Sequence, residues 1–340
     1  MKNKQIVLIA VMLSSATSCM AQFSKDVAQA YLLYNKARLL EASGHLDSAA
    51  MLMKKSILLN NKNGTTRDYA EEIYIKAGHY TDFVNDVKDY YAKNTLPENA
   101  DEIFSGYDSA TVARAKKSKE IMEFLASYDG LLKKNRTTVK VNHELKQILE
   151  NCIAVDQFVR FYVIRSSKIN IDKEFMPRLM CYTDSTNMEQ VAAYIRKKGL
   201  PTSVELDGIT MSSNFVLSFF HYIQNSVSYS KYTAWKYLDS TIRQAVYNGV
   251  YPVTFYLRCL DNRYVYANID PNTKISRQLY GTWHEPSFDE VTKKKIRVYE
   301  PGFEDIEHLD ERRAMWLLPS LYEESLIDPE IRLPENYHHK

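Results

Sequence analysis

Ala42-Ser43-Gly44-His45-Leu46-Asp47 recurs further along the chain as Lys76-Ala77-Gly78-His79-Tyr80, which Thr81-Asp82 follows. The two glycines are 34 residues apart. Glycine favours a tight turn, and the residues around the first turn carry apolar side chains at helical spacing. These residues are Leu33, Ala37, Leu40, Ala49 and Met53. Residues 24–94 are therefore expected to form two helical hairpins, with small residues where the paired helices approach closely.

The period and the shared turn resemble those of tetratricopeptide repeats, which pair two helices in each unit. The resemblance covers residues 24–94 and implies a helical surface that docks an unknown protein partner. Two units are short for an independent array, so the helical stretch 101–134 is expected to cap them. His45 and His79 occupy equivalent turns without thiols or carboxylates at ligand spacing, so we interpret them as turn residues rather than a metal pair.

The segment that follows the repeats marks the expected division of the chain. Residues 135–141 are basic and polar and lack helical periodicity, which predicts a linker. It would separate a helical-repeat domain, 22–134, from a second helical domain, 142–326, and a loose tail, 327–340. Helices are expected over 143–164, 189–198, 214–225, 232–248, the stretch after Pro252, and 305–325.

A single β element is expected in the second domain. Lys295–Glu300 alternates apolar and polar side chains, which predicts a short strand, and 279–284 is its expected partner in a hairpin. The predicted fold class is therefore mainly α, with N-terminal helical hairpins and a C-terminal helical domain that carries one small β-hairpin.

The first residues have the composition of a secretory signal. Residues 2–18 run from two lysines through the apolar stretch Ile6–Leu13 to small side chains. This stretch is far shorter than the ~20 residues of a membrane-spanning helix. Cleavage after Ala21 and lipidation at Cys19 are both open, although the usual leucine three residues before a lipidated cysteine is absent. The expected location is the periplasm or outer membrane of a Gram-negative bacterium, with a lipid on Cys19 as the sole membrane link.

The charge balance and the glycine content exclude several classes of function. The chain has 44 Lys and Arg against 42 Asp and Glu, and the two lysines of the signal segment account for the excess. A neutral mature chain has no general field that attracts nucleic acid. With 10 glycines and no G-x-G-x-x-G, phosphate loop, G-x-S-x-G or H-E-x-x-H motif, no cofactor and no metal are expected.

The cysteines also bear on the compartment and the chemistry. Cleavage after Ala21 leaves Cys152, Cys181 and Cys259, which are widely spaced and include no C-x-x-C. An odd count argues against a disulfide framework despite export. Buried thiols are expected, and one disulfide is the alternative.

A series of polar residues gives the second domain a further resemblance. In order, they are Asp156-Gln157-x-x-Arg160, Asp184-x-x-Asn187, Gly199-x-Pro201, Gly208, His221, Asp261, Arg263, Gln278-x-Tyr280-Gly281-Thr282 and Arg313. Their order and spacing resemble a bacterial helical family described only as a domain of unknown function. Two positions depart from that pattern: Asn262 separates the aspartate from the arginine, and Trp283 stands where glutamine is typical. The resemblance implies a helical fold and no particular activity.

His221 is the centre of the candidate site. It lies on an otherwise apolar predicted helix, in one polar stripe with Asn214, Ser218 and Asn225. A histidine oriented by a carboxylate is a general base, and an arginine beside it is an anion clamp. The catalytic candidates are His221, Asp156 and Asp261; the ligand-binding candidates are Arg160, Asp184, Arg263, Gln278, Tyr280, Thr282 and Arg313. The same groups also suit a buried polar network that fixes helix register.

Three classes of function therefore remain open. The first is an exported binding or assembly protein, whose repeats dock a protein partner and whose second domain recognises an unknown ligand. The second is a metal-independent hydrolase centred on His221, and the third is a structural component of the envelope. The sequence lacks the paired signatures of a nucleophile and its base, which favours binding over catalysis.

The signal segment generates a direct prediction. Mass spectrometry of the protein from its native host should find a chain that begins at Gln22 or at a lipidated Cys19, because residues 1–21 have the signal composition. A full-length chain with Met1, recovered from the cytosolic fraction, would contradict the prediction.

Overall fold

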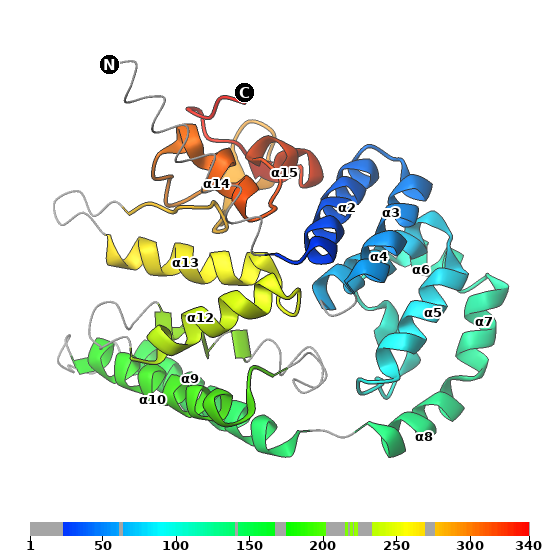
Figure 1. Ribbon diagram of the computed structural model, residues 1–340, viewed down its shortest axis with the longest axis horizontal. Helices are drawn as coiled ribbons and strands as arrows, with labels where there is room; N and C mark the ends of the chain where they lie inside the picture. Colours follow the sequence, from blue (N-terminus) through cyan, green and yellow to red (C-terminus); the bar gives the residue numbers. More distant parts are fainter. Residues whose placement is uncertain are drawn as a thin grey trace. The chain divides into compact units, whose positions relative to one another are not determined.

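The computed structural model describes residues 23–60, 64–139, 142–166, 175–201, 215–216, 218–219, 221–223, 233–268 and 276–339. The signal segment and the sequence-predicted positions Gly208, Asn214 and Asn225 lie outside the described residues. The predicted mainly α fold with one small sheet is confirmed (Figure 1). The chain divides into two compact units: unit 1 combines residues up to 63 with those from 242 onward, and unit 2 contains residues 64–241. The predicted linker lies within unit 2, and the sequence-based domain boundaries stay a prediction.

The first hairpin, in unit 1, consists of α2 (Lys25–Ala42) and α3 (Leu46–Leu59), which lie side by side (Figure 1). The Ser24 side chain caps α2 by accepting a hydrogen bond from the backbone of the first turn. The fully buried Ala37 and Ala49 lie on the two helices, as the spacing predicted.

The second hairpin, in unit 2, consists of α4 (Gly64–Ala77) and α5 (Tyr80–Tyr91). Its turn has the geometry of the first: φ is +79° at Gly78 and +80° at Gly44, a left-handed conformation that suits glycine. In both turns the backbone N–H of the following histidine donates to a carbonyl five residues earlier, at 2.8 Å for His45 and 2.9 Å for His79. The predicted pair of similar helical hairpins is therefore confirmed.

The segment expected to cap the repeats is helical. It contains η1 (Ala100–Phe104), α6 (Ser109–Ala115), α7 (Lys119–Ala126) and α8 (Tyr128–Thr138). The prediction of non-helical structure after Lys134 was wrong, because α8 continues to Thr138. The polar Asn135 anchors this end of the helix, so apolar periodicity could not reveal it. The Asn135 amide donates to the carbonyls of Tyr91 and Asn94, and its Oδ1 accepts from the backbone of Leu96.

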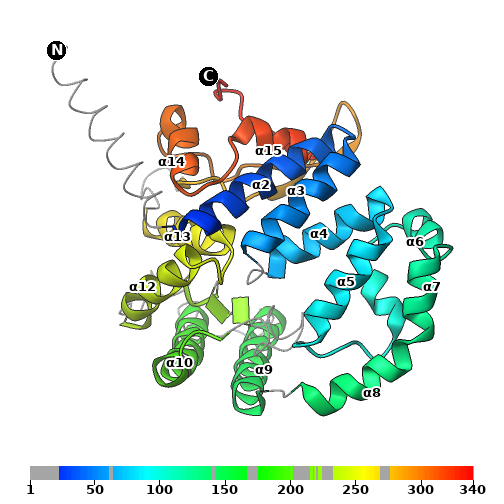
Figure 2. The same ribbon diagram turned by 45° about the vertical axis from the view of Figure 1, so that its right-hand side comes forward.

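The next pair of helices in unit 2 is α9 (His143–Ser166) and α10 (Phe175–Lys198), which lie side by side (Figure 2). The helix predicted over 143–164 corresponds to α9. The next helix was predicted to begin at residue 189, with Asp184 before it as a cap or turn residue. Asp184 instead lies inside α10 and is buried. The error arose because α10 directs polar side chains inward: the buried Asn187 donates to the carbonyl of Cys152 at 2.8 Å.

Unit 1 joins the first hairpin to the C-terminal part of the chain. α12 (Thr233–Tyr247) crosses the boundary between units, and α13 (Val253–Ala267) follows it. The Tyr31 hydroxyl donates to the carbonyl of Tyr251 at 3.3 Å, and Asn35 donates to the carbonyl of Leu317 at 2.6 Å. The ring of Phe23 contacts those of Tyr247 and Trp316 edge-on. These contacts make α2 a core element of unit 1.

A three-stranded sheet lies near the C-terminus. β1 (Glu285–Asp289) pairs antiparallel with β2 (Lys294–Val298), and β3 (Ile331–Arg332) pairs parallel with β2. The prediction that residues 279–284 pair with β2 was wrong. Backbone N–H groups within residues 279–282 donate to the Asp261 side chain and not to a neighbouring strand. Residues 327–339, expected to be a loose tail, contribute β3 and the buried Ile331.

The helix predicted over 305–325 is divided. η2 (Ile306–His308) leads into α14 (Leu309–Met315), and α15 (Leu321–Ile327) begins after a break. Leu317 has φ of +60° in the break, and Pro319 cannot donate a helical hydrogen bond. Ser320 and Glu323 then form a capping box that starts α15.

The close approach of α2 and α3 generates a stability prediction. Because Ala49 is fully buried, Ala49→Leu should overpack the hairpin and lower the free energy of unfolding by roughly 1–3 kcal/mol. Lys55→Leu, on an exposed position of the same helix, is the matched control and should change it by less than about 0.5 kcal/mol. Denaturant melts of both variants would measure this, and equal stabilities would contradict the close packing.

Candidate functional site

Four of the sequence-predicted residues converge in unit 2. Asp156 and Arg160 lie one turn apart on α9, and the Arg160 Nε donates to the Asp156 Oδ1 at 2.7 Å. The other side of the guanidinium reaches α10, where Nη2 lies 3.0 Å from both carboxylate oxygens of Asp184. His221 Nδ1 lies 3.1 Å from the same Asp156 oxygen. We call Asp156, Arg160, Asp184 and His221 the α9–α10 cluster.

The electrostatics of the α9–α10 cluster favour an ionised Asp156. Burial by itself would raise the pKa of Asp156, but hydrogen bonds from His221 and Arg160 lower it to about 2. Since a carboxylate only accepts, Nδ1 is the protonated nitrogen of His221 in this contact. The two carboxylate side chains are 5% and 2% exposed, whereas those of Arg160 and His221 are 18% and 16% exposed, so solvent reaches these two basic side chains more than the carboxylates.

The cluster has the donor atoms of a metal site but not its charge balance. Ligand atoms of Asp156, Asp184 and His221 all lie within 4.8 Å of one another. Arg160 bridges the two carboxylates, so a metal ion would have to displace a guanidinium bonded to both. The residues therefore fit a polar network that joins α9, α10 and the helical residues around His221 better than they fit a metal centre.

The cysteines supply no activated nucleophile to this cluster. Among the described residues, Cys152, Cys181 and Cys259 are buried and outside any disulfide, as predicted for thiols. Burial raises the pKa of Cys152 and of Cys181 to about 11, and Asp184 contributes to the shift at Cys181. Both side chains are therefore thiols at neutral pH, and a thiol is a weak nucleophile.

The remaining candidates form a second cluster, in unit 1, around the turn Gln278–Thr282. Asp261 on α13 is fully buried and accepts hydrogen bonds from the backbone of Leu279, Tyr280 and Thr282 at 2.6, 2.8 and 3.0 Å. The Thr282 hydroxyl donates to the same carboxylate at 2.7 Å. Burial raises the pKa of Asp261, and these hydrogen bonds oppose the shift. We call this group the Asp261 turn.

Arg313 binds the opposite side of the Asp261 turn. Its guanidinium is 1% exposed and donates to the carbonyls of Tyr280, Gly281 and Pro319 and to Glu324. Gly281 has φ of +68°, and a Cβ there would lie 2.7 Å from the Phe303 ring. The backbone donors of Leu279, Tyr280 and Thr282 bind one carboxylate, and the turn's carbonyls bind the guanidinium groups of Arg312 and Arg313, which is the arrangement of a structural turn.

Gln278 and Arg263 complete the set of candidates. Gln278 is fully buried, and its amide nitrogen donates to the carbonyls of Trp283 and Pro301 at 3.1 and 2.8 Å. Arg263 is exposed on α13, whereas the neighbouring Asn262 is buried and donates to the carbonyl of Arg258. The structure thus brings the candidates other than Arg263 together in two groups, one in each unit. The catalytic and ligand-binding roles assigned from the sequence stay predictions.

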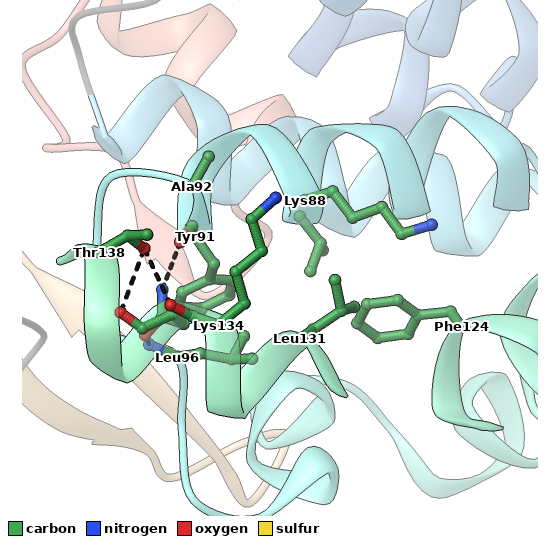
Figure 3. A pocket seen from close by; sticks show the side chains of 10 residues that line it. Lys88, Tyr91, Ala92, Leu96, Phe124, Leu131, Lys134 and Thr138 are labelled. Atoms are coloured by element: carbon green, nitrogen blue, oxygen red, sulfur yellow. Dashed lines mark hydrogen bonds between the residues drawn. The ribbon is translucent and has the colours of Figure 1, made fainter. Parts of the chain in front are cut away.

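The sequence analysis missed a pocket in unit 2. A cavity of about 350 Å³ lies between α5, α7 and α8 (Figure 3). The residues that line it are Val87, Lys88, Tyr91, Ala92, Leu96, Phe124, Leu131, Lys134, Asn135 and Thr138. The lining includes two lysines and no acidic residue. We call this cavity the α5–α8 pocket.

No sequence motif marks the α5–α8 pocket, because its residues come from three helices and one loop. The available signal was the basic content of α8, which contains Lys133, Lys134 and Arg136, but the predicted linker began at residue 135 and divided this group.

Comparison with known protein families, with curated proteins and with solved structures found no match. Among the described residues, no helix is both long enough and apolar enough to cross a membrane. The function of this chain is therefore inferred from its own geometry.

The α9–α10 cluster generates a pH prediction. The pKa of Asp156 is lowered from 3.8 to about 2 by folding, so its contribution to stability is present above pH about 4 and is lost as the pH falls toward 2. Partial solvent screening reduces the expected loss to roughly 1–2 kcal/mol. Denaturant melts at several pH values should show this loss in the wild type and a smaller one in Asp156→Asn.

Asp129→Asn, at an exposed position of α8, is the matched control and should keep the acid dependence of the wild type. If Asp156→Asn lost as much stability as the wild type over the same interval, Asp156 would not be held ionised by its partners.

Proposed function

We propose that this protein is an exported, non-catalytic binding protein of the cell envelope, whose ligand site is the α5–α8 pocket. The observation that carries the proposal is the pocket itself: about 350 Å³, lined mainly by apolar side chains, with two cations and no acid. Cavities of roughly 300–1,000 Å³ with mostly apolar walls and a few polar groups are typical of small-molecule sites.

The position of the pocket supports a binding role for the helical hairpins. Its walls come from α5, the second helix of the second hairpin, and from α7 and α8, which were expected to cap the repeats. We propose that the hairpins are tetratricopeptide-type repeats that present this site. A protein partner would then be recruited through the same hairpins, while the second helical domain would belong to the bacterial family that its polar residues resemble.

Export rests on the composition of residues 2–21 and is part of the proposal. A basic start, a short apolar stretch and small residues support removal of the segment at Ala21 or lipidation at Cys19. The binding site would then operate in the periplasm or at the outer membrane.

A hydrolase centred on His221 is the second candidate, and one contact favours it. His221 Nδ1 lies 3.1 Å from Asp156 Oδ1, which is the arrangement that orients a general base. The same carboxylate oxygen also accepts from Arg160, however, and the described thiols nearby are poor nucleophiles. Binding at the α5–α8 pocket therefore explains more of the geometry than catalysis at His221.

The binding proposal predicts that a neutral apolar dye occupies the pocket. A neutral naphthylamine dye should gain fluorescence on the wild type and saturate at one equivalent. Leu131→Trp fills the pocket and should abolish the signal, whereas Leu132→Trp, its neighbour on α8 outside the pocket lining, should keep it. Fluorescence titration measures both, after circular dichroism has shown that each variant is folded.

Ala92→Trp gives a second block at an exposed lining position, in case Leu131→Trp does not fold. Identical dye binding by the wild type and a folded pocket-blocking variant, or no binding by the wild type, would contradict the proposal.

A further inference from the structure

We infer that the ligand of the α5–α8 pocket is an anionic amphiphile, a single alkyl chain that ends in a carboxylate-like head group. This inference rests on the proposed binding function and specifies its ligand class. It follows from three properties of the pocket: the charge of its lining, the chemistry of its walls, and its size.

The charged side chains of the lining are both positive. Lys88 and Lys134 are exposed, and neither forms an ion pair with any residue that the structure describes. The Lys88 ammonium lies 6.0 Å from the centre of the Phe124 ring, at the edge of the apolar wall. Figure 3 shows the Lys134 side chain reaching from α8 toward α5. Two cations in the lining, without an acid among its residues, complement an anionic group.

The walls of the pocket offer a polar ligand little to bind. Val87, Leu96 and Phe124 are buried apolar residues of the lining. The one amide, Asn135, already donates to two backbone carbonyls and accepts from a backbone N–H. The Thr138 hydroxyl likewise donates to the carbonyls of Lys134 and Asn135 (Figure 3). With this amide and this hydroxyl satisfied internally, Tyr91 supplies the remaining uncharged polar side-chain group of the lining, and the interior favours an alkyl chain over a sugar, a nucleotide or a polar peptide.

The size of the pocket limits the ligand to one chain. A volume of about 350 Å³ lies near the lower end of the range for ligand sites. The combination of one short apolar chain and one anionic group describes a free medium-chain fatty acid or the equivalent acyl group of a larger molecule.

The test is displacement of the neutral dye by alkyl probes from the full-length mature protein. Decanoate should displace the dye, and across hexanoate, octanoate and decanoate the affinity should rise about fourfold for each added methylene, because each buried CH₂ contributes about 0.8 kcal/mol. Decanol, which keeps the chain and lacks the charge, should bind at least about tenfold more weakly than decanoate.

Matched variants separate the two cations from the general charge of the surface. Lys88→Gln combined with Lys134→Gln should weaken decanoate about tenfold or more and leave decanol and the dye unchanged. Lys93→Gln combined with Lys133→Gln changes the net charge equally at exposed positions outside the pocket lining and should leave decanoate unchanged. Vesicles of a two-chain anionic phospholipid, tested by cosedimentation, should not retain the protein without its signal segment if the source is a free acid.

The outcomes distinguish the inference from the function on which it rests. The binding site is supported if Leu131→Trp blocks the dye. The anionic ligand is nevertheless overturned if decanol and decanoate then bind with equal affinity, or if the Lys88 and Lys134 substitutions have no effect. Absence of both dye and decanoate binding would overturn both proposals. Cosedimentation lost in the double lysine variant would assign the head group to a membrane lipid and overturn the free acid.

Discussion

Hydrogen bonds between buried polar groups hold distant segments together within each of the two units. Asp261 binds the backbone of a turn 18 to 21 residues further along the chain, and Arg313 binds the carbonyls of the same turn. In unit 2, Arg160 on α9 binds Asp156 of its own helix and Asp184 of α10, and the second contact connects the two helices. Asn135 performs the same task with a single amide, which fixes the end of α8 against the loop after α5. Removing one member of such a group would strand its partners without water.

The local parts of the fold were predictable because their causes are local. Gly44 and Gly78 require left-handed turns, and the apolar spacing around them predicts the hairpins. The polar residues of the second domain were recognised as a set, and the structure does bring several of them together. Two features could not be anticipated: the first half of α10 was missed because it buries polar side chains, and the last turn of α8 was missed because a buried asparagine, not an apolar residue, anchors it.

The buried polar clusters and the α5–α8 pocket differ in how many of their polar side chains already have partners within the protein. Asp261 has four donors, and Arg313 binds three carbonyls and a carboxylate, so both are satisfied within the protein. The α5–α8 pocket, in contrast, combines satisfied walls with two lysines whose charge no described acid neutralises. The residues that form a recognisable pattern in the sequence therefore have less free bonding capacity for a ligand than the lysines of the pocket. The polar residues recognised in the sequence mainly satisfy one another inside the protein. The proposed binding pocket is formed by residues that belong to no recognisable motif.

The contacts of α2 with the C-terminal part of unit 1 have a consequence for biogenesis. Tyr31 bonds to a residue 220 positions away, and Asn35 to one 282 positions away. Until the ribosome has delivered those distant segments, α2 lacks the partners that stabilise it in the native state. Chains dominated by such distant pairings fold slowly, because loop closure costs entropy before the contacts form. Because those partners lie in the last third of the chain, α2 completes its native packing only after most of the chain has been synthesised.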